Sequence, residues 1–271
     1  MEDAACGRFL QWALPRLGMR WAGFRRVRRQ VCKRIGRRIG EMNLPDVSAY
    51  RSFLESHPEE WEVLDGLCRV QVSRFYRDRV VFEILEREVL PRLAETVVAG
   101  GGNAIRCWSA GCASGEEPYS LALMWECRVA PRIPRFGIEI VATDSDAESL
   151  RRAEAGIYAR SSLRDLPADL RETGFDPSTG RFVLKPEYRN RVVFSLQDVR
   201  SDMPEGPFHL ILCRNIVFTY FDEEIQRGIL KKLWGRLVPG GFLVIGRRES
   251  LPEGAKGFDG LSGGKGIYTR K

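Results

Sequence analysis

The stretch WSAGCASGEEPYSLAL, residues 108–123, decides the fold class of this chain. It passes from an apolar run into small residues that favour a tight turn, and two glutamates and a proline then begin a helical pattern. Small-residue turns between a strand and a helix line ligand sites at the carboxyl ends of strands in open α/β sheets. We therefore expect a binding site at this turn, with two carboxylates beside it.

Short apolar runs alternate with helical patterns downstream of this turn. Because strands separated by helices need crossover connections, we expect a mainly parallel sheet covered on both faces, an α/β class. A turn signal at residues 176–180 predicts an inserted antiparallel β hairpin, at residues 174–195. The predicted strands are 104–110, 138–143, 191–196, 208–213 and 242–246, and the predicted helices are 118–127, 146–156 and 223–237.

The N-terminal part of the chain has a different pattern, in which apolar residues recur every three or four positions. This period predicts amphipathic helices, and two more are expected at residues 46–57 and 59–70. We predict an all-α N-terminal domain with its linker at residues 1–80 and a second domain at residues 81–271. The apolar positions of the basic helix are Phe24, Val27, Val31 and Ile35.

The net charge of +7 is concentrated near the N-terminus. A basic surface attracts an acidic protein face, nucleic acid or anionic lipid by the same Coulomb forces, so its sign does not choose among them. A solvated helix face is the alternative interpretation. From position 16 to position 38 the chain has ten basic residues and no acid, and the next acid is Glu41: Arg16, Arg20, Arg25, Arg26, Arg28, Arg29, Lys33, Arg34, Arg37 and Arg38.

Cysteine and histidine usage excludes several classes of site. The seven cysteines form an odd count without a C-x-x-C pair, and the chain has two histidines. This pattern favours reduced, mostly buried thiols over a disulfide framework or a metal site. No uncharged apolar run approaches about 18 residues, and the N-terminus lacks the basic start of a secretory signal. We expect a cytoplasmic protein without a membrane span.

The charges of the turn predict the class of ligand. The turn matches neither G-x-G-x-x-G nor the P-loop, and Glu116 and Glu117 suit a cationic ligand rather than a phosphate. The next strand ends at Asp144, whose carboxylate can accept hydrogen bonds from both hydroxyls of a ribose. S-adenosylmethionine (SAM) combines adenosine, a sulfonium and an ammonium, so it is the predicted cofactor. The alternative role of Glu117 is a capping box with Ser114.

Five segments occur in order along the chain, namely SRFYRD (73–78), SAGCASGEEPYSLAL (109–123), VATDSDAESLRRAEAGIY (141–158), HLILCRNIVFTYFD (209–222) and LVPGGFLVIG (237–246). Together they resemble the CheR family of chemotaxis receptor methyltransferases, which methylate protein glutamates with SAM. The resemblance covers roughly residues 20 to 250 and implies a helical N-terminal domain, a Rossmann-like methyltransferase domain and a small inserted β subdomain.

The resemblance also implies the residues of the site. Arg77 and Tyr220 are implied to lie closest to the reacting carboxylate and are the candidate catalytic residues. A surface salt bridge for Arg77 and a core position for Tyr220 are the alternatives. The implied cofactor contacts are Ser73, Arg77, Ala110, Gly111, Glu117, Asp144, Asp198, Val199, Arg214 and Asn215.

The expected reaction needs no general base, because a carboxylate with a pKa of about 4.3 is already ionised at neutral pH. The expected acceptor is a glutamate on an acidic protein helix that docks on the basic N-terminal helix. A small molecule, for example a small carboxylate, or another nucleophile is the alternative, since CRNIVFTYFD (213–222) is one residue longer than the family's usual spacing. In the same comparison, GRRES (246–250) replaces the family's usual GHSE.

Two further classes carry less support. Base-methylating enzymes commonly place an acidic or amide residue before Pro-Pro-aromatic after the fourth strand, whereas here Asn215 is followed by Ile216. This difference argues against nucleic acid as the substrate. A SAM-binding module without activity is the other alternative, and the presence of candidate substrate residues argues against it.

Overall fold

The computed structural model describes residues 3–271, and contacts divide the chain into two units. The helical unit comprises Met1–Gln71 together with Thr219–Gln226, and the sheet unit comprises Val72–Phe218 and Arg227–Lys271. A segment of eight residues late in the sequence therefore packs with the N-terminal helices. The domain limits at residues 1–80 and 81–271 stay a prediction.

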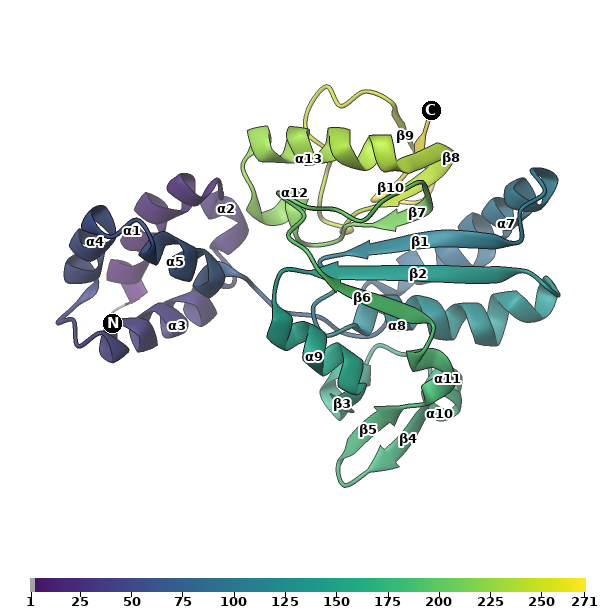
Figure 1. The fold of residues 1–271 in the computed structure, drawn as a ribbon, viewed down its shortest axis with the longest axis horizontal. Coiled ribbons are helices and arrows are strands. Elements are labelled where there is room, and N and C mark those ends of the chain that lie inside the picture. The colour runs from purple at the N-terminus through teal and green to yellow at the C-terminus, as the bar shows by residue number, and fades with distance from the viewer. Residues whose placement is uncertain (1–2) are drawn as a thin grey trace. The chain divides into compact units, whose positions relative to one another are not determined.

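The regular elements in the N-terminal part of the helical unit are all helices among the described residues, as predicted, apart from one isolated β-bridge between Met19 and Phe221. Asp46 begins the fourth helix, because its carboxylate accepts the N–H groups of Ser48 and Ala49 at 2.8 and 2.9 Å. Val31 and Ile35, two of the predicted apolar positions, are fully buried. The helices are α1 (Asp3–Ala13), α2 (Trp21–Phe24), α3 (Arg28–Glu41), α4 (Val47–Ser56) and α5 (Glu60–Cys68) (Figure 1).

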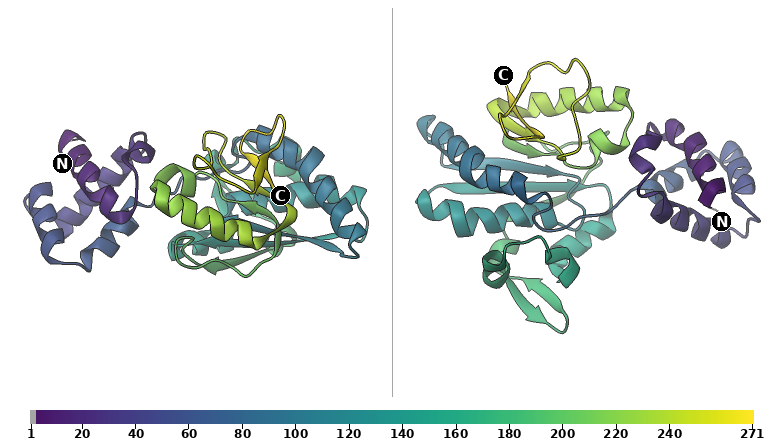
Figure 2. Two further views of the ribbon diagram at one scale, coloured as in Figure 1. Left: turned by 90° about the horizontal axis from the view of Figure 1, so that it is seen from above. Right: turned by 180° about the vertical axis from the view of Figure 1, so that it is seen from behind.

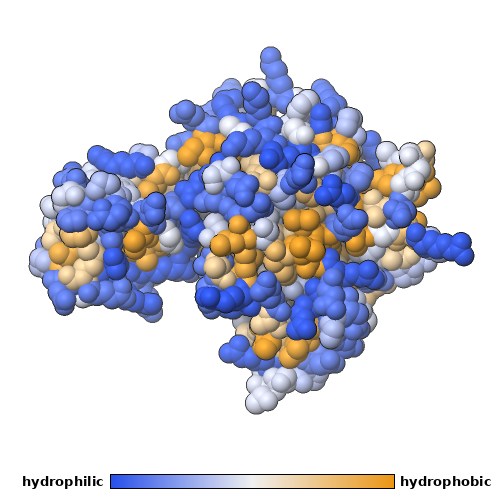
Figure 3. All heavy atoms as spheres, viewed as in Figure 1, coloured by the Kyte–Doolittle hydropathy of each residue, from blue (hydrophilic) through white to orange (hydrophobic). Residues whose placement is uncertain are grey.

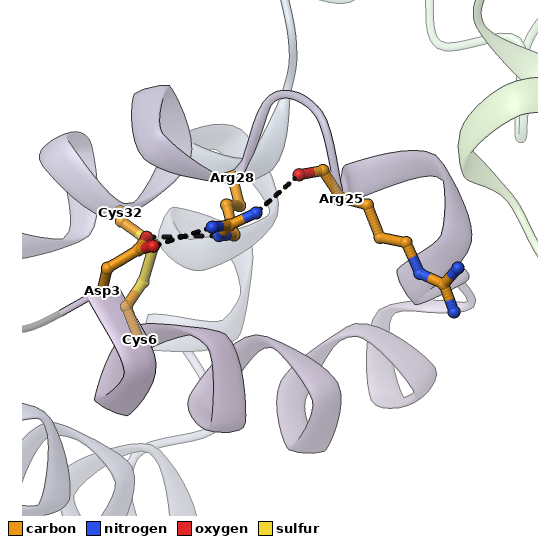
Figure 4. The surroundings of a disulfide bond; sticks show 5 residues. All are labelled: Asp3, Cys6, Arg25, Arg28 and Cys32. Carbon is orange, nitrogen blue, oxygen red and sulfur yellow. Dashed lines mark hydrogen bonds and ion pairs between the residues drawn. A yellow bond between two sulfur atoms is a disulfide. The ribbon is translucent and has the colours of Figure 1, made fainter.

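A disulfide between Cys6 and Cys32 joins α1 to α3, so the expectation that all cysteines are reduced thiols is wrong for this pair. Figure 4 shows the bond beside Arg28, which pairs with Asp3 at 2.8 Å and donates to the carbonyl of Arg25. The two cysteines are 26 positions apart, and the packing of two helices brings them together. The other five cysteines are free.

The sheet unit contains a seven-stranded sheet in the order β6-β2-β1-β7-β8-β10-β9. The first five strands in this order are parallel, and β10 then pairs antiparallel with both β8 and β9. The parallel part has the arrangement of a Rossmann-like sheet. The strands are β1 (Ala104–Ala110), β2 (Gly137–Asp144), β6 (Val192–Leu196), β7 (Phe208–Leu212), β8 (Leu237–Val244), β9 (Phe258–Gly260) and β10 (Ile267–Arg270).

Helices cover the sheet, as the crossover connections require. α7 contacts β1 and α8 contacts β2, and the views in Figures 1 and 2 place both helices along the strands. No helix among residues 3–271 is long and apolar enough to cross a membrane. The remaining helices are α6 (Arg79–Ile84), α7 (Leu90–Ala99), α8 (Glu116–Met124), α9 (Ala147–Ala155), α10 (Ala168–Gly174), α11 (Pro186–Arg189), α12 (Val217–Tyr220) and α13 (Glu223–Arg236).

All five predicted strands of the large sheet are present, and the structure adds more. β8 begins five residues earlier than predicted, with a positive φ of 74° at Gly240 and a register shift opposite Phe208 and Leu210. β9 and β10 are too short to show a strand pattern in the sequence. The predicted hairpin forms from β4 (Phe175–Ser178) and β5 (Arg181–Leu184), and β3 (Ile157–Ala159) pairs with β5 to complete a separate three-stranded antiparallel sheet.

The edge strand β6 leaves part of its apolar surface uncovered. Val193 is 66% exposed and Leu196 is 59% exposed. Figure 3 shows hydrophobic groups on the face where β6 runs in Figure 1. The core of the unit lies instead around β1, where Cys107 and Trp108, on opposite faces of the strand, are both fully buried.

Candidate functional site

The turn between β1 and α8 is fixed to the end of β2. Gly111 and Gly115 have φ values of 73° and 86°, and a Cβ on Gly111 would lie 2.7 Å from Cδ1 of Ile216. The N–H groups of Gly111 and Cys112 donate to the carbonyl of Thr143 at 2.8 and 3.0 Å. Glycine is thus required both by backbone conformation and by close packing, as the small-residue pattern indicated.

Asp144 joins the turns that follow β1 and β2. Its Oδ2 accepts the N–H of Ala113 at 2.8 Å, and its Oδ1 accepts the N–H of Asp146 at 3.0 Å. Ala113 reaches this bond with a positive φ of 49°. The carboxylate is therefore held at the carboxyl edge of the sheet by two backbone donors from different turns.

Glu117 lies in a buried network of charges. Its Oε1 accepts the hydroxyl of Ser109 at 2.8 Å, and its Oε2 lies 3.1 Å from a guanidinium nitrogen of Arg214. The helix N-cap is Gly115, without a side-chain capping bond, so the capping box with Ser114 is not formed. Glu117 instead ties α8 to β1 and to the turn after β7.

Arg214 connects this network to the SRFYRD segment. Its side chain is 2% exposed, pairs with Asp78 at 2.9 Å and donates to the backbone carbonyl of Arg77 at 2.7 Å. The guanidinium also lies over the ring of Phe82, 5.5 Å from its centroid. Two carboxylates therefore face one guanidinium, which leaves a net negative charge in the network.

Glu116 is the buried acid that the sequence interpretation noted but did not assign to the site. It is 6% exposed, burial raises its pKa above the ordinary 4.5, and a hydrogen bond with Ser73 acts against this rise. Its Oε2 has no hydrogen-bond partner within residues 3–271. The two adjacent glutamates in the motif were the sequence signal that could have identified Glu116 as a second site residue, because adjacent side chains at the start of a helix point in different directions.

The SRFYRD segment is bent around Arg77. Tyr76 and Asp78 have positive φ values of 55° and 61°, and the Tyr76 N–H donates to the hydroxyl of Ser120 at 2.9 Å. The Arg77 guanidinium donates to the carbonyl of Val72 at 2.7 Å. Within the described residues Arg77 is therefore bonded to a backbone oxygen rather than to a carboxylate.

Asn215 follows β7 in a left-handed conformation with a φ of 59°. Its N–H donates to Oε2 of Glu249 at 2.8 Å, and the same oxygen accepts the N–H of Gly246. Glu249 is 7% exposed. The turns after β7 and β8 are thus joined by one buried carboxylate.

The remaining predicted cofactor residues occupy different positions in the sheet unit. Ala110 is fully buried at the end of β1. Asp198 follows β6 and pairs with Arg200 at 2.6 Å, and the neighbouring Val199 is 5% exposed. No group of three or more acidic, histidine or cysteine side chains that could hold a metal is found in residues 3–271.

Tyr220 belongs to the helical unit, whereas every other predicted site residue belongs to the sheet unit. Its ring centroid lies 5.0 Å from that of Phe24, and its carbonyl accepts the N–H of Arg20 at 2.8 Å. A Cβ on Gly23 would lie 2.2 Å from the carbonyl oxygen of Thr219, so the backbones approach closely there. The tyrosine is half-buried rather than a core residue.

Comparison with known proteins identifies similar sequences. The family model described as "CheR methyltransferase, SAM binding domain" matches residues 71–267. A chemotaxis protein methyltransferase of Salmonella typhimurium is 32% identical over 260 residues, which cover 93% of this chain and 85% of that protein. Chemotaxis protein methyltransferase 1 of Pseudomonas aeruginosa is 38% identical over 182 residues, 65% of each chain.

A third relative is longer. An uncharacterised 104.1 kDa protein of Rhodobacter capsulatus is 33% identical over 235 residues, which are 86% of this chain and 24% of that protein. The chain therefore spans about a quarter of the length of the Rhodobacter protein and about two thirds of that of the Pseudomonas protein. The Salmonella match covers 93% of this chain and therefore extends over both the helical pattern and the sheet.

Proposed function

Because the chain belongs to the CheR methyltransferase family, we propose that this SAM-dependent methyltransferase esterifies a glutamate side chain on an acidic protein helix, as a cytoplasmic enzyme. The observation that carries the proposal is the placement of Asp144, Glu117 and Asn215. Asp144 ends β2, and Glu117 and Asn215 follow β1 and β7, at one edge of a parallel sheet, where ligands bind in this architecture.

The donor set of the site fits SAM. Asp144 is held by two backbone N–H groups at the position expected for a ribose partner. Glu116 supplies a buried carboxyl oxygen without a partner in the described residues, and the network of Glu117, Arg214 and Asp78 has a net negative charge. When bound, SAM supplies an electrophilic methyl group on a sulfonium. A negative site favours such a cationic ligand.

The residues of the chain have binding and positioning roles in this proposal. Arg77 is the proposed partner of the acceptor carboxylate, because a guanidinium binds a carboxylate with two parallel hydrogen bonds. Its present bond to the carbonyl of Val72 would then be exchanged for the acceptor. Tyr220 is the proposed orienting hydroxyl. Neither residue has to remove a proton from an ionised carboxylate.

The exposed side of α3 supports an acidic partner. Arg28 and Arg38 are paired with Asp3 and Glu60, within the helical unit. The exposed basic residues recur along the other side of the helix with helical spacing and form the α3 basic face, namely Arg29, Lys33 and Arg37. A stripe of like charges at this spacing can attract an acidic helix along the whole length of the α3 basic face.

A methyl-transfer assay tests the proposal. The enzyme, labelled SAM and a glutamate-rich helical protein are incubated, and alkali-labile methanol is measured together with the site of modification by mass spectrometry. We expect the wild-type enzyme to place alkali-labile label on glutamate. The label should be lost in Arg77→Ala and reduced in Tyr220→Phe, and Tyr220→Phe should retain its affinity for S-adenosylhomocysteine (SAH). Label that survives alkali, or that appears in small carboxylates but not in protein, would contradict the proposal.

A further inference from the structure

The turn after β8 holds two cations whose role the cofactor site does not explain. The chain leaves β8 through Ile245 and Gly246, and Arg247 and Arg248 then form the turn before Glu249. Both arginines are exposed, and neither has a hydrogen-bond, ion-pair or ring partner among residues 3–271. All of these residues belong to the sheet unit.

Glu249 fixes the position of this turn. Its Oε2 accepts the N–H of Gly246 at 2.5 Å and that of Asn215 at 2.8 Å, while its own N–H donates to the carbonyl of Gly246 at 2.8 Å. A carboxylate that accepts two backbone N–H groups while 7% exposed is held in one orientation. The turn therefore has a defined conformation, and its two exposed positions are both arginine.

Close packing places the turn against the candidate site. A Cβ on Gly246 would lie 2.9 Å from Oδ1 of Asn215, so the backbone of the turn lies directly beside that side chain. Asn215 follows β7 at the carboxyl edge of the sheet. Arg247 and Arg248 thus directly follow Gly246, which contacts the candidate cofactor residue Asn215.

Two adjacent arginines do not help this fold, because like charges repel and no carboxylate of the described chain pairs with them. Guanidinium groups bind carboxylates strongly through paired hydrogen bonds. We propose that Arg247 and Arg248 bind an anionic side chain next to the target carboxylate, so that the enzyme selects acidic polypeptides with at least two neighbouring carboxylates. This inference rests on the proposed methylation of protein carboxylates.

The test uses two short helical peptides that share one target glutamate. Its neighbours are aspartates in the acidic peptide and asparagines in the neutral peptide, and methylation of the target is followed by mass spectrometry. We expect the wild-type enzyme to show a kcat/KM about tenfold higher for the acidic peptide. In the double variant Arg247→Gln/Arg248→Gln this preference should fall to about twofold or less, with the rate on the neutral peptide unchanged.

Arg132 and Arg135 provide a matched control. They are also exposed, but they precede β2 at the opposite, amino end of the sheet. The double variant Arg132→Gln/Arg135→Gln has the same change of net charge and should keep the preference. Binding of SAH, measured by calorimetry, should be the same in all three proteins.

The outcomes separate this inference from the proposed function. Alkali-stable label, or no methylation of either peptide by the wild-type enzyme, would overturn both. Methylation without a preference for the acidic peptide would overturn the role of Arg247 and Arg248 alone. The same conclusion would follow if the control variant lost the preference to the same extent.

Discussion

Two buried glutamates, one in each unit, show how differently the same side chain is used. Glu60 of the helical unit is 4% exposed and Glu116 of the sheet unit is 6% exposed. Hydrogen bonding with Arg38 lowers the pKa of Glu60, whereas burial raises the pKa of Glu116. The two acids are buried to a similar extent, and burial alone raises the pKa of both; the hydrogen bonds of Glu60 reverse the direction of its shift.

The difference lies in the partners. Glu60 accepts hydrogen bonds from Tyr50 at 2.9 Å and from two nitrogens of Arg38 at 2.9 and 2.7 Å. Glu116 has Ser73 beside it, and its Oε2 has no partner among residues 3–271. A buried acid with all its bonds made stabilises a domain, while one with an unused oxygen is a candidate for binding a ligand.

Replacement of Glu60 should have the largest effect on stability. In Glu60→Gln the paired guanidinium of Arg38 loses its counter-charge, and we expect unfolding free energy to fall by about 2–3 kcal/mol, since Arg38 is partly exposed. Thermal and urea unfolding measure the change. Glu55→Gln, which breaks an exposed pair with Arg51, is the control and should change stability by less than about 0.5 kcal/mol. A comparable loss in both variants would contradict the distinction.

Replacement of Asp144 tests whether a carboxylate that already accepts hydrogen bonds from the protein also contributes to binding of the ligand. We expect Asp144→Ala to weaken SAH binding about 100-fold, because it removes the proposed charged acceptors for the ribose and loosens the turn at Ala113. Calorimetric titration gives the dissociation constant. Asp146→Asn, on the same turn, is the comparison and should retain most of the affinity. Wild-type affinity in Asp144→Ala would exclude the proposed cofactor site.

Glu116→Gln sharpens the contrast between the two acids directly. The change keeps the shape of the side chain and removes the charge, so we expect about tenfold weaker SAH binding with no loss of stability. The same titration applied to Glu60→Gln should show unchanged affinity. If Glu60→Gln weakens binding as much as Glu116→Gln does, the unpartnered oxygen is not the mark of the site.

The pH dependence of stability should have opposite signs for the two glutamates. The pKa of Glu60 is lowered from 4.5, so its stabilisation is present above that value and is lost as pH falls through the folded-state pKa. The pKa of Glu116 is raised from 4.5, so its contribution is present below that value and is lost as pH rises through the folded-state pKa.

Melting temperatures at about pH 4 and pH 8 measure this smallest effect. The melting temperature of Glu60→Gln should fall further below that of wild type at the higher pH than at the lower pH. The melting temperature of Glu116→Gln should exceed that of wild type at the higher pH and equal it at the lower pH. Parallel pH profiles for the two variants would show that the opposite pKa shifts do not exist in solution.

The sequence predicted those parts of the molecule that depend on local pattern. The five strands of the parallel sheet and the turn at Gly111 follow from apolar runs and small residues, and both are confirmed. β9, β10 and the disulfide of Cys6 with Cys32 were missed, because each depends on packing between segments rather than on local spacing.

The site residues were predicted as a set, but their contacts could not be. Arg214 was assigned to the cofactor, and the structure shows its guanidinium bound to Glu117, Asp78 and the carbonyl of Arg77. Such a network joins three distant stretches of sequence. The role of each predicted residue toward SAM stays a prediction that the variants above address.

The segment Thr219–Gln226 has a consequence for the order in which the protein is made. The N-terminal helices leave the ribosome first, but the contacts that Arg20 and Phe24 make with Tyr220 need a segment that begins about 150 residues after Gln71, where the N-terminal part of the unit ends. The helical unit therefore reaches its final form after most of the sheet unit has been translated. At typical elongation rates this delay is roughly 7 to 30 s, a period in which the early helices are open to chaperones.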